Sequence, residues 1–168
     1  RGSFFRVLLL KDLTMNSTKK ILITFFICFA TTHTLANTLV SSVTNNSYED
    51  VRDNLVDAIE EKALNISKIY HASDMLNRTK DSISNAKEIY HQAEIIEFCS
   101  ASISHQLVLA NHLNISACPF KIALYTLSNN SKQTHLVYTK LKPLDQQSEA
   151  PTIKANKLIQ SLIENATW

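Results

Sequence analysis

Two cysteines and two histidines lie within the twenty residues CSASISHQLVLANHLNISAC, as Cys99, His105, His112 and Cys118. Such side chains could hold a metal ion, but structural zinc sites rely on close pairs such as C-x2-C or H-x3-H, and this segment has neither. On one helix, His105 and His112 would share a face but lie about 10 Å apart, too far for one zinc ion. We therefore expect no metal site here.

Three alternatives remain for the two cysteines. A reactive thiol needs a paired base and a lowered pKa, and His105 is six residues beyond Cys99. Two buried free thiols are also consistent with the sequence, because cysteine is among the most buried residue types. We favour a disulfide between Cys99 and Cys118, since an export signal (below) puts the chain where disulfides persist. Closing a loop of this length would stabilise the fold by about 3 kcal/mol.

The export signal is the segment from Met15 to Ala36, MNSTKKILITFFICFATTHTLA. It has a positive start, an apolar stretch from Ile21 to Ala30, and a small-x-small site that predicts cleavage between Ala36 and Asn37. Ten apolar residues span about 15 Å as a helix, half of a hydrocarbon core of about 30 Å, so cleavage is favoured over anchoring. Residues 1–14 are interpreted as an over-extended reading frame or a cloning remnant, and residues 37–168 as one domain.

Charge and composition exclude several function classes. Five of the 17 basic residues and one of the 15 acidic residues precede Asn37, which leaves 12 basic and 14 acidic residues and a net charge of −2. Without a basic cluster, nucleic acid is not an expected partner. No glycine follows Gly2, so a phosphate-cradling loop is excluded, and no G-x-S-x-G, P-loop or H-E-x-x-H motif is present.

The periodicity of the mature chain predicts an α+β domain with a mixed or antiparallel sheet and packed helices, because strands and helices intermix without strict alternation. The helix after Ser47 begins with a capping-box-like S-x-x-D. Expected strands are Thr38–Thr44, Ile66–Ala72, Ala93–Cys99, Phe120–Leu127 and Thr134–Leu141. Expected helices are Tyr48–Lys62, one or two within Ser73–Ile89, Ser102–Leu113, and a last helix from about Pro151 with Ile153, Leu158, Ile159, Leu162 and Ile163 on its apolar side.

Five segments resemble the bacterial and archaeal domain-of-unknown-function family 302, DUF302. They cover the chain from about Asn46 to Leu141 and read SYEDVRDNLVDAIEEKALNI, IYHASDML, AEIIEFCSASISHQLVLA, ACPFKIALYTL and HLVYTKL. The resemblance implies a small α+β domain with a TATA-binding-protein-like arrangement. It implies no catalytic residues, because none are established for the family.

Three positions depart from the family pattern. The family usually has glycine where this chain has Ala63, so we expect Asn65 to take the left-handed turn instead. A frequent G/C-N-P turn of the family is replaced by Cys99-Ser100-Ala101. Where the family often has an Asp-His pair, this chain has Tyr70 before His71, so no acid lies beside the imidazole in sequence, and we expect a surface or turn histidine.

We expect a periplasmic binding or accessory domain without catalysis of its own and without a bound cofactor. The alternative is a redox, cofactor- or metal-handling protein that uses Cys99 and Cys118 with His71 or His105 as ligand. Membrane contact is expected only in transit, through the signal peptide. The sequence leaves the partner open, a homodimer included.

Overall fold

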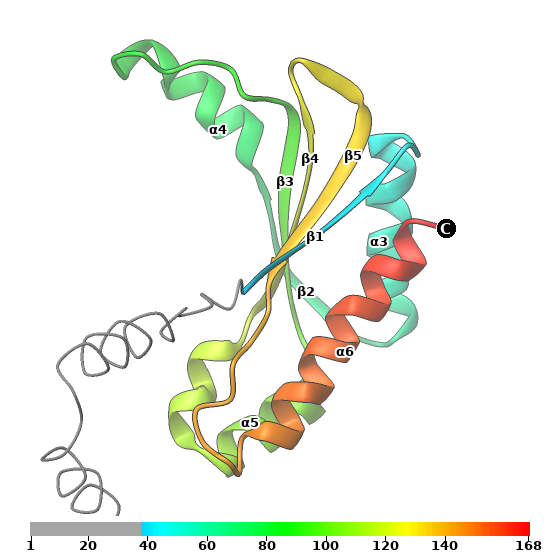
Figure 1. Ribbon diagram of the computed structural model, residues 1–168, viewed down its shortest axis with the longest axis vertical. Coiled ribbons are helices and arrows are strands. Elements are labelled where there is room, and N and C mark those ends of the chain that lie inside the picture. Colours follow the sequence, from blue (N-terminus) through cyan, green and yellow to red (C-terminus); the bar gives the residue numbers. More distant parts are fainter. Residues whose placement is uncertain (1–37) are drawn as a thin grey trace, which may run out of the picture. The chain divides into compact units, whose positions relative to one another are not determined.

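The computed structural model describes residues 38–168 (Figure 1). The predicted signal peptide, its cleavage site between Ala36 and Asn37 and the upstream extension lie outside the described residues. In the part that is described, no helix is long and apolar enough to cross a membrane.

Within residues 38–168, five strands form one sheet in the order β1-β5-β4-β3-β2, and every neighbouring pair is antiparallel. The strands are β1 (Leu39–Thr44), β2 (Asn65–His71), β3 (Tyr90–Cys99), β4 (Phe120–Leu127) and β5 (Asn130–Thr139). The α-helices are α3 (Tyr48–Glu61), α4 (Ala72–Thr79), α5 (Ala101–Ala110) and α6 (Glu149–Ala166). Two 3₁₀ helices, η1 (Lys80–Ser82) and η2 (His112–Ala117), complete the fold. The predicted α+β domain with packed helices is confirmed.

The core lies between the sheet and the helices α3 and α6, which run along one face of the sheet (Figure 1). Alternate residues of the central strands point into this core, as Leu124 of β4 and Leu136 of β5 do, and both are fully buried. Leu55 of α3 and Leu162 of α6 meet them from the helix side and are also fully buried. This two-layer packing leaves β1 and β2 as the sheet's two edges.

Helix α3 forms as its sequence predicts. The hydroxyl of Ser47 accepts a hydrogen bond of 3.1 Å from the N–H of Asp50, which satisfies one of the free donors at the helix start. Val51, Leu55 and Ile59 follow at helical spacing, and each is fully buried.

The end of α3 differs from the expectation. Ala63, and not Asn65, takes the left-handed conformation, with φ 52°, while Asn65 is already the first residue of β2. The N–H of Ala63 donates to the carbonyl of Glu60 at 2.8 Å, and the N–H of Leu64 to that of Ile59 at 3.2 Å. This pair of bonds is a Schellman motif, which fixes the left-handed residue directly after the C-cap and so at Ala63.

Several boundaries also differ. Strand β5 begins at Asn130 and not at Thr134, because a two-residue turn lets Asn130 pair with Leu127. Helix α5 ends at Ala110 because the side chain of Asn111 accepts from the N–H of Leu113 and starts η2. His105 and His112 therefore do not share a helix. The region Ser73–Ile89 holds only α4 and η1, without regular structure after them, and β3 begins at Tyr90, ahead of the expected Ala93.

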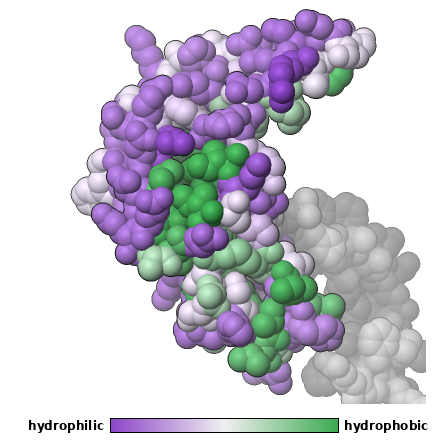
Figure 2. Space-filling model, turned by 180° about the vertical axis from the view of Figure 1, so that it is seen from behind, coloured by the Kyte–Doolittle hydropathy of each residue, from purple (hydrophilic) through white to green (hydrophobic). Residues whose placement is uncertain are grey.

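Figure 2 shows hydrophobic surface in more than one place, and one such area lies at the end of the molecule that carries α5 and η2. Leu109 of α5 is 82% exposed, and Leu113 and Ile115 of η2 are also exposed. On the inner side of α5, Leu107 is buried and Ile103 packs against the core. The helix is apolar on more than one side, so burying one side leaves leucine on another.

Candidate functional site

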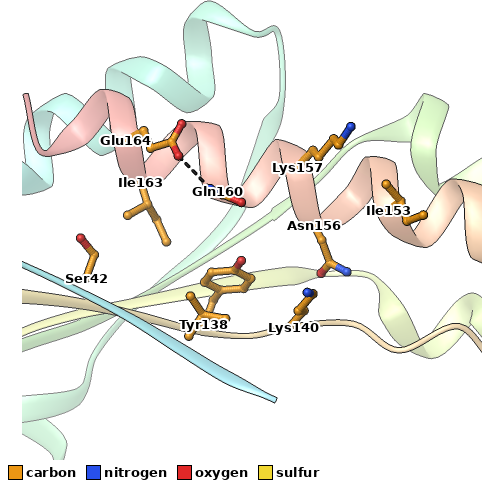
Figure 3. Close-up of a pocket in the computed structure, with 10 residues that line it drawn as sticks. Ser42, Tyr138, Lys140, Ile153, Asn156, Lys157, Gln160, Ile163 and Glu164 are labelled. Atoms are coloured by element: carbon orange, nitrogen blue, oxygen red, sulfur yellow. Dashed lines mark hydrogen bonds between the residues drawn. The ribbon is translucent and has the colours of Figure 1, made fainter. Parts of the chain in front are cut away.

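A groove of about 550 Å³ runs between α6 and the edge of the sheet formed by β1 and β5 (Figure 3). Its floor is built from Val40 and Ser42 of β1 and from Tyr138 of β5. These side chains share one face because successive strand residues alternate between faces and Val40 is opposite Tyr138 in the β1–β5 pair. The groove therefore lies on the helix-covered face, at its outer margin.

One stripe of α6 forms the wall of the groove. Ile153, Asn156, Gln160 and Ile163 follow each other at spacings of three and four, so they lie on the same side of the helix. The prediction that Ile153 lies on the apolar side of this helix is wrong, since the residue is 47% exposed and lines the groove. An isoleucine that the fold leaves uncovered is available to contact an apolar ligand.

The hydroxyl of Tyr138 is the central polar atom of the floor. The residue is 5% exposed, and within the described residues its hydroxyl has no hydrogen-bond partner. Burial, and then the carboxylate of Glu164, raise the pKa of Tyr138. The hydroxyl therefore stays protonated at neutral pH and can donate a hydrogen bond to a ligand.

Charges are separated along the groove (Figure 3). Lys140, just after β5, and Lys157 of α6 lie toward one end, and Glu164 lies toward the other. The carboxylate of Glu164 accepts from the side chain of Gln160 at 2.8 Å. Across residues 38–168, neither lysine ammonium group has a hydrogen bond or an ion pair. The lysine end is therefore the one with unpaired charge to offer an anion.

Asn156 fixes the lysine end of the groove. Its amide nitrogen donates to the carbonyl of Leu141 at 3.0 Å, and its oxygen accepts from the N–H of Leu141 at 2.9 Å. The segment after β5 is thereby attached to α6, which holds Lys140 beside the helix. A groove that combines the apolar side chains of Val40, Ile153 and Ile163 with one free hydroxyl and a lysine at one end is suited to binding an amphipathic anion.

The structure also brings Cys99 and Cys118 together. Their Sγ atoms lie 2.03 Å apart and their Cα atoms 6.1 Å apart, so the pair is at disulfide distance. Cys99 ends β3 and Cys118 lies two residues before β4, at the same end of two paired strands. The chain between them is α5 and η2.

His71 has an acidic partner that sequence order did not reveal. The Nδ1 atom of His71 lies 2.8 Å from a carboxylate oxygen of Glu94, which is on the adjacent strand β3 and directly opposite in register. The other oxygen of Glu94 accepts from Nε of Arg52 at 3.4 Å. The expectation that no acid lies next to His71 in sequence holds, and the acidic partner comes instead from the neighbouring strand.

Tyr48 lies beside this ion-pair cluster. Its hydroxyl is buried and has no hydrogen-bond partner in the described part of the chain, and burial followed by the charge of Glu94 raises its pKa. The imidazole of His71 is 60% exposed, while the carboxylate of Glu94 is 13% exposed. The cluster thus joins an accessible imidazole to a shielded carboxylate.

His105 lies on α5 and is exposed, away from any group of ligands. Among residues 38–168, no group of three or more His, Cys, Asp or Glu side chains could hold a metal ion. The groove and the residue Glu94 were missed by the sequence reasoning. A signal for the groove was present in the sequence, because the residues at i+3, i+4 and i+7 from Ile153 are Asn156, Lys157 and Gln160, which places this isoleucine on a mainly polar side of its helix.

Comparison with known proteins gives a family and a fold. The model of the family described as "Domain of unknown function DUF302" matches residues 40–166. A solved structure, the crystal structure of an uncharacterized conserved protein DUF302 from Bacillus stearothermophilus, is similar with a TM-score of 0.63. The two chains are 12% identical, and the match covers 78% of this chain and 99% of the other, which shows a shared fold. No curated protein matches the chain.

Proposed function

The chain belongs to the DUF302 family of domains of unknown function, and from this premise we propose that it is an exported, non-catalytic binding module of the periplasm. Its ligand is an amphipathic small molecule that carries a carboxylate, sulfonate or phosphate group. The observation that carries the proposal is the groove beside α6, where Ile153 is uncovered and Tyr138 has a free hydroxyl.

The groove's dimensions support a small ligand. A volume of about 550 Å³ is within the range of about 300–1,000 Å³ for small-molecule sites. The apolar part of the ligand would contact Val40, Ile153 and Ile163, and its anionic group would meet Lys140. The hydroxyl of Tyr138 would donate to a polar atom of the ligand.

Anilinonaphthalene sulfonate, an amphipathic anion that fluoresces in apolar surroundings, is a direct probe of this site. We expect saturable binding to the native protein, weakened about two- to fivefold by Lys140→Gln, which is the size of one exposed charge contact. Lys132→Gln, an exposed change of the same charge outside the groove, is the matched control. Fluorescence titration at low and moderate salt measures both. Equal weakening by the two variants, or a signal that does not saturate, would contradict the proposal.

Redox chemistry at Cys99 and Cys118 is the second candidate function. The two sulfur atoms lie at disulfide distance, which favours a thiol–disulfide pair over two cysteines that bind a cofactor. It requires that the pair cycle between thiols and a disulfide in the native protein. His71 and His105 would then serve as ligands or bases, and His71 already has a carboxylate partner in Glu94. The experiment on the cysteines described in the Discussion separates this candidate from a structural link.

A further inference from the structure

Strand β1 is an edge strand without the usual protection of edges. Its sequence, LVSSVT, contains no charged residue and no proline, and its pairing with β5 has no bulge. In the sheet that residues 38–168 form, β1 is the outermost strand and lies next to β5. Val43 is 51% exposed. A regular, uncharged edge of this kind is a template for pairing with another strand.

The hydrogen-bond pattern shows which backbone groups face outward. The carbonyl of Thr38 accepts from the N–H of Lys140 at 2.6 Å, so Thr38 faces the sheet. In an antiparallel pair, inward- and outward-facing residues alternate. Ser41 and Val43 therefore direct their N–H and C=O groups away from β5, where another strand could meet them.

The other edge of the sheet is different. Strand β2 carries Lys68 and His71, and its register shifts between Ile66 and Lys68. Charges and bulges are the devices that keep edges from pairing. Helix α4 also follows β2 directly and packs against β3. The contrast singles out β1 as the edge open to a partner.

We propose that β1 pairs antiparallel with β1 of a second copy of this chain, so that two sheets join into one across a twofold axis. In a twofold dimer of this kind, the same strand of each copy lies on both sides of the contact. The sequence LVSSVT has no charged residue, so the pairing brings no like charges together. A different protein with a charged strand would find no opposite charge on β1 to pair with.

The pairing also bears on the groove. Val40 and Ser42 form its floor and belong to the edge strand, so the groove is bordered on its outer side by the edge itself. A twofold axis perpendicular to the sheet keeps both α6 helices on the same face. The second copy therefore extends the floor beyond β1 and places the two grooves next to each other over the seam.

A proline at an outward-facing position tests the pairing. Ser41→Pro removes an N–H that points away from β5, which edge strands tolerate, while the β1–β5 bonds remain. We expect the unaltered protein to have twice the mass of one chain by light scattering after gel filtration. Ser41→Pro should weaken dimerisation at least about tenfold, because each dimer loses two backbone hydrogen bonds. Ser41→Ala, which keeps the N–H, is the control and should dimerise normally.

Val43→Lys is a second variant that leaves every backbone group in place and puts a charge on the edge. It should weaken dimerisation with unchanged circular dichroism, and it keeps the test valid if the proline variant does not fold. The proposal is overturned if the unaltered protein is monomeric at every concentration measured. It is also overturned if both Ser41→Pro and Val43→Lys fold and still dimerise, or if Ser41→Ala disrupts dimers as strongly as the proline.

Discussion

Ala63 has a positive φ angle of 52° although it carries a Cβ atom. The left-handed conformation costs a non-glycine residue about 1–2 kcal/mol, and the Schellman bonds at the end of α3 hold Ala63 in it. Ala63→Gly should therefore stabilise the protein by about 1 kcal/mol, less the greater freedom that glycine has in the unfolded chain. Urea unfolding should show a higher midpoint with an unchanged slope.

Ala101→Gly is the control for this prediction. Ala101 is exposed in the first turn of α5 and has a negative φ angle, so glycine there brings only its entropic cost. This variant should lose stability, by at most about 1 kcal/mol. A loss of stability in Ala63→Gly as well would contradict the prediction that Ala63 has a costly left-handed conformation in solution.

His71 shows at the same scale what a sequence can and cannot reveal about a site. Tyr70 before it indicates that no acid is adjacent in the chain, and that statement is correct. Glu94 is 23 positions away and reaches His71 only because β2 and β3 pair in a specific register. Register between distant strands depends on the whole sheet, so this couple could not be predicted from neighbouring residues.

The segment between Cys99 and Cys118 consists of α5 and η2, whose outer side exposes several large apolar side chains. A link between the two cysteines would restrict this segment in the unfolded chain. Cys99→Ser should then lower the free energy of unfolding by about 2–5 kcal/mol. Ser102→Ala, exposed in the same segment, should change it by no more than about 0.5 kcal/mol. Chemical denaturation under non-reducing conditions measures both.

Thiol labelling of the folded protein separates a structural link from a redox pair. For a structural disulfide, we expect no free thiol until the protein is unfolded and reduced. Easy reduction of the native protein with one low-pKa thiolate exposed would identify a working redox pair. Rapid alkylation of either cysteine in freshly isolated protein would contradict a disulfide altogether.

At the scale of helices and strands, the sequence predicts those features that neighbouring residues determine, such as a helix cap or an apolar side. The cap at Ser47 and the spacing of Val51, Leu55 and Ile59 predict α3, since a capped amphipathic helix needs only its own residues and a core. Strand β5 begins earlier than predicted because Asn130 gains its partner from β4 and not from its own apolar pattern. Ends set by pairing are therefore less predictable than faces set by periodicity.

At the scale of the whole molecule, the α+β architecture follows from the order of elements, whereas the groove does not. Its floor and wall come from Val40 near one end of the domain and Ile153 near the other. The prediction that Ile153 lies on the apolar side of α6 is wrong, because its neighbours at i+3, i+4 and i+7 are Asn156, Lys157 and Gln160, and the buried residues of the helix lie on another side. Thr152 and Ala155 on either side of Ile153 are buried, so Ile153 lines the groove because it points to another side of the helix than they do.

The proposed export affects the whole protein, because a disulfide between the two cysteines persists only in an oxidising compartment such as the periplasm. The apolar stretch after Lys19 and Lys20 is too short to span a membrane comfortably and is followed by a small-x-small site. We therefore expect a mature N-terminus at or near Asn37 in the periplasmic fraction of a bacterial host. Mass spectrometry of the intact protein measures this N-terminus and the disulfide together.

Reversing the charge of Lys19 and Lys20 to glutamate should block this processing, because the positive start of a signal peptide is required for its orientation. The same reversal at Lys132 and Lys142, both exposed in the folded domain, should leave processing unchanged and controls for net charge. Intact Met15 in the membrane pellet of the unaltered protein would instead show an uncleaved anchor. In that case the domain would act at the membrane surface, and a freely diffusing binding module would be excluded.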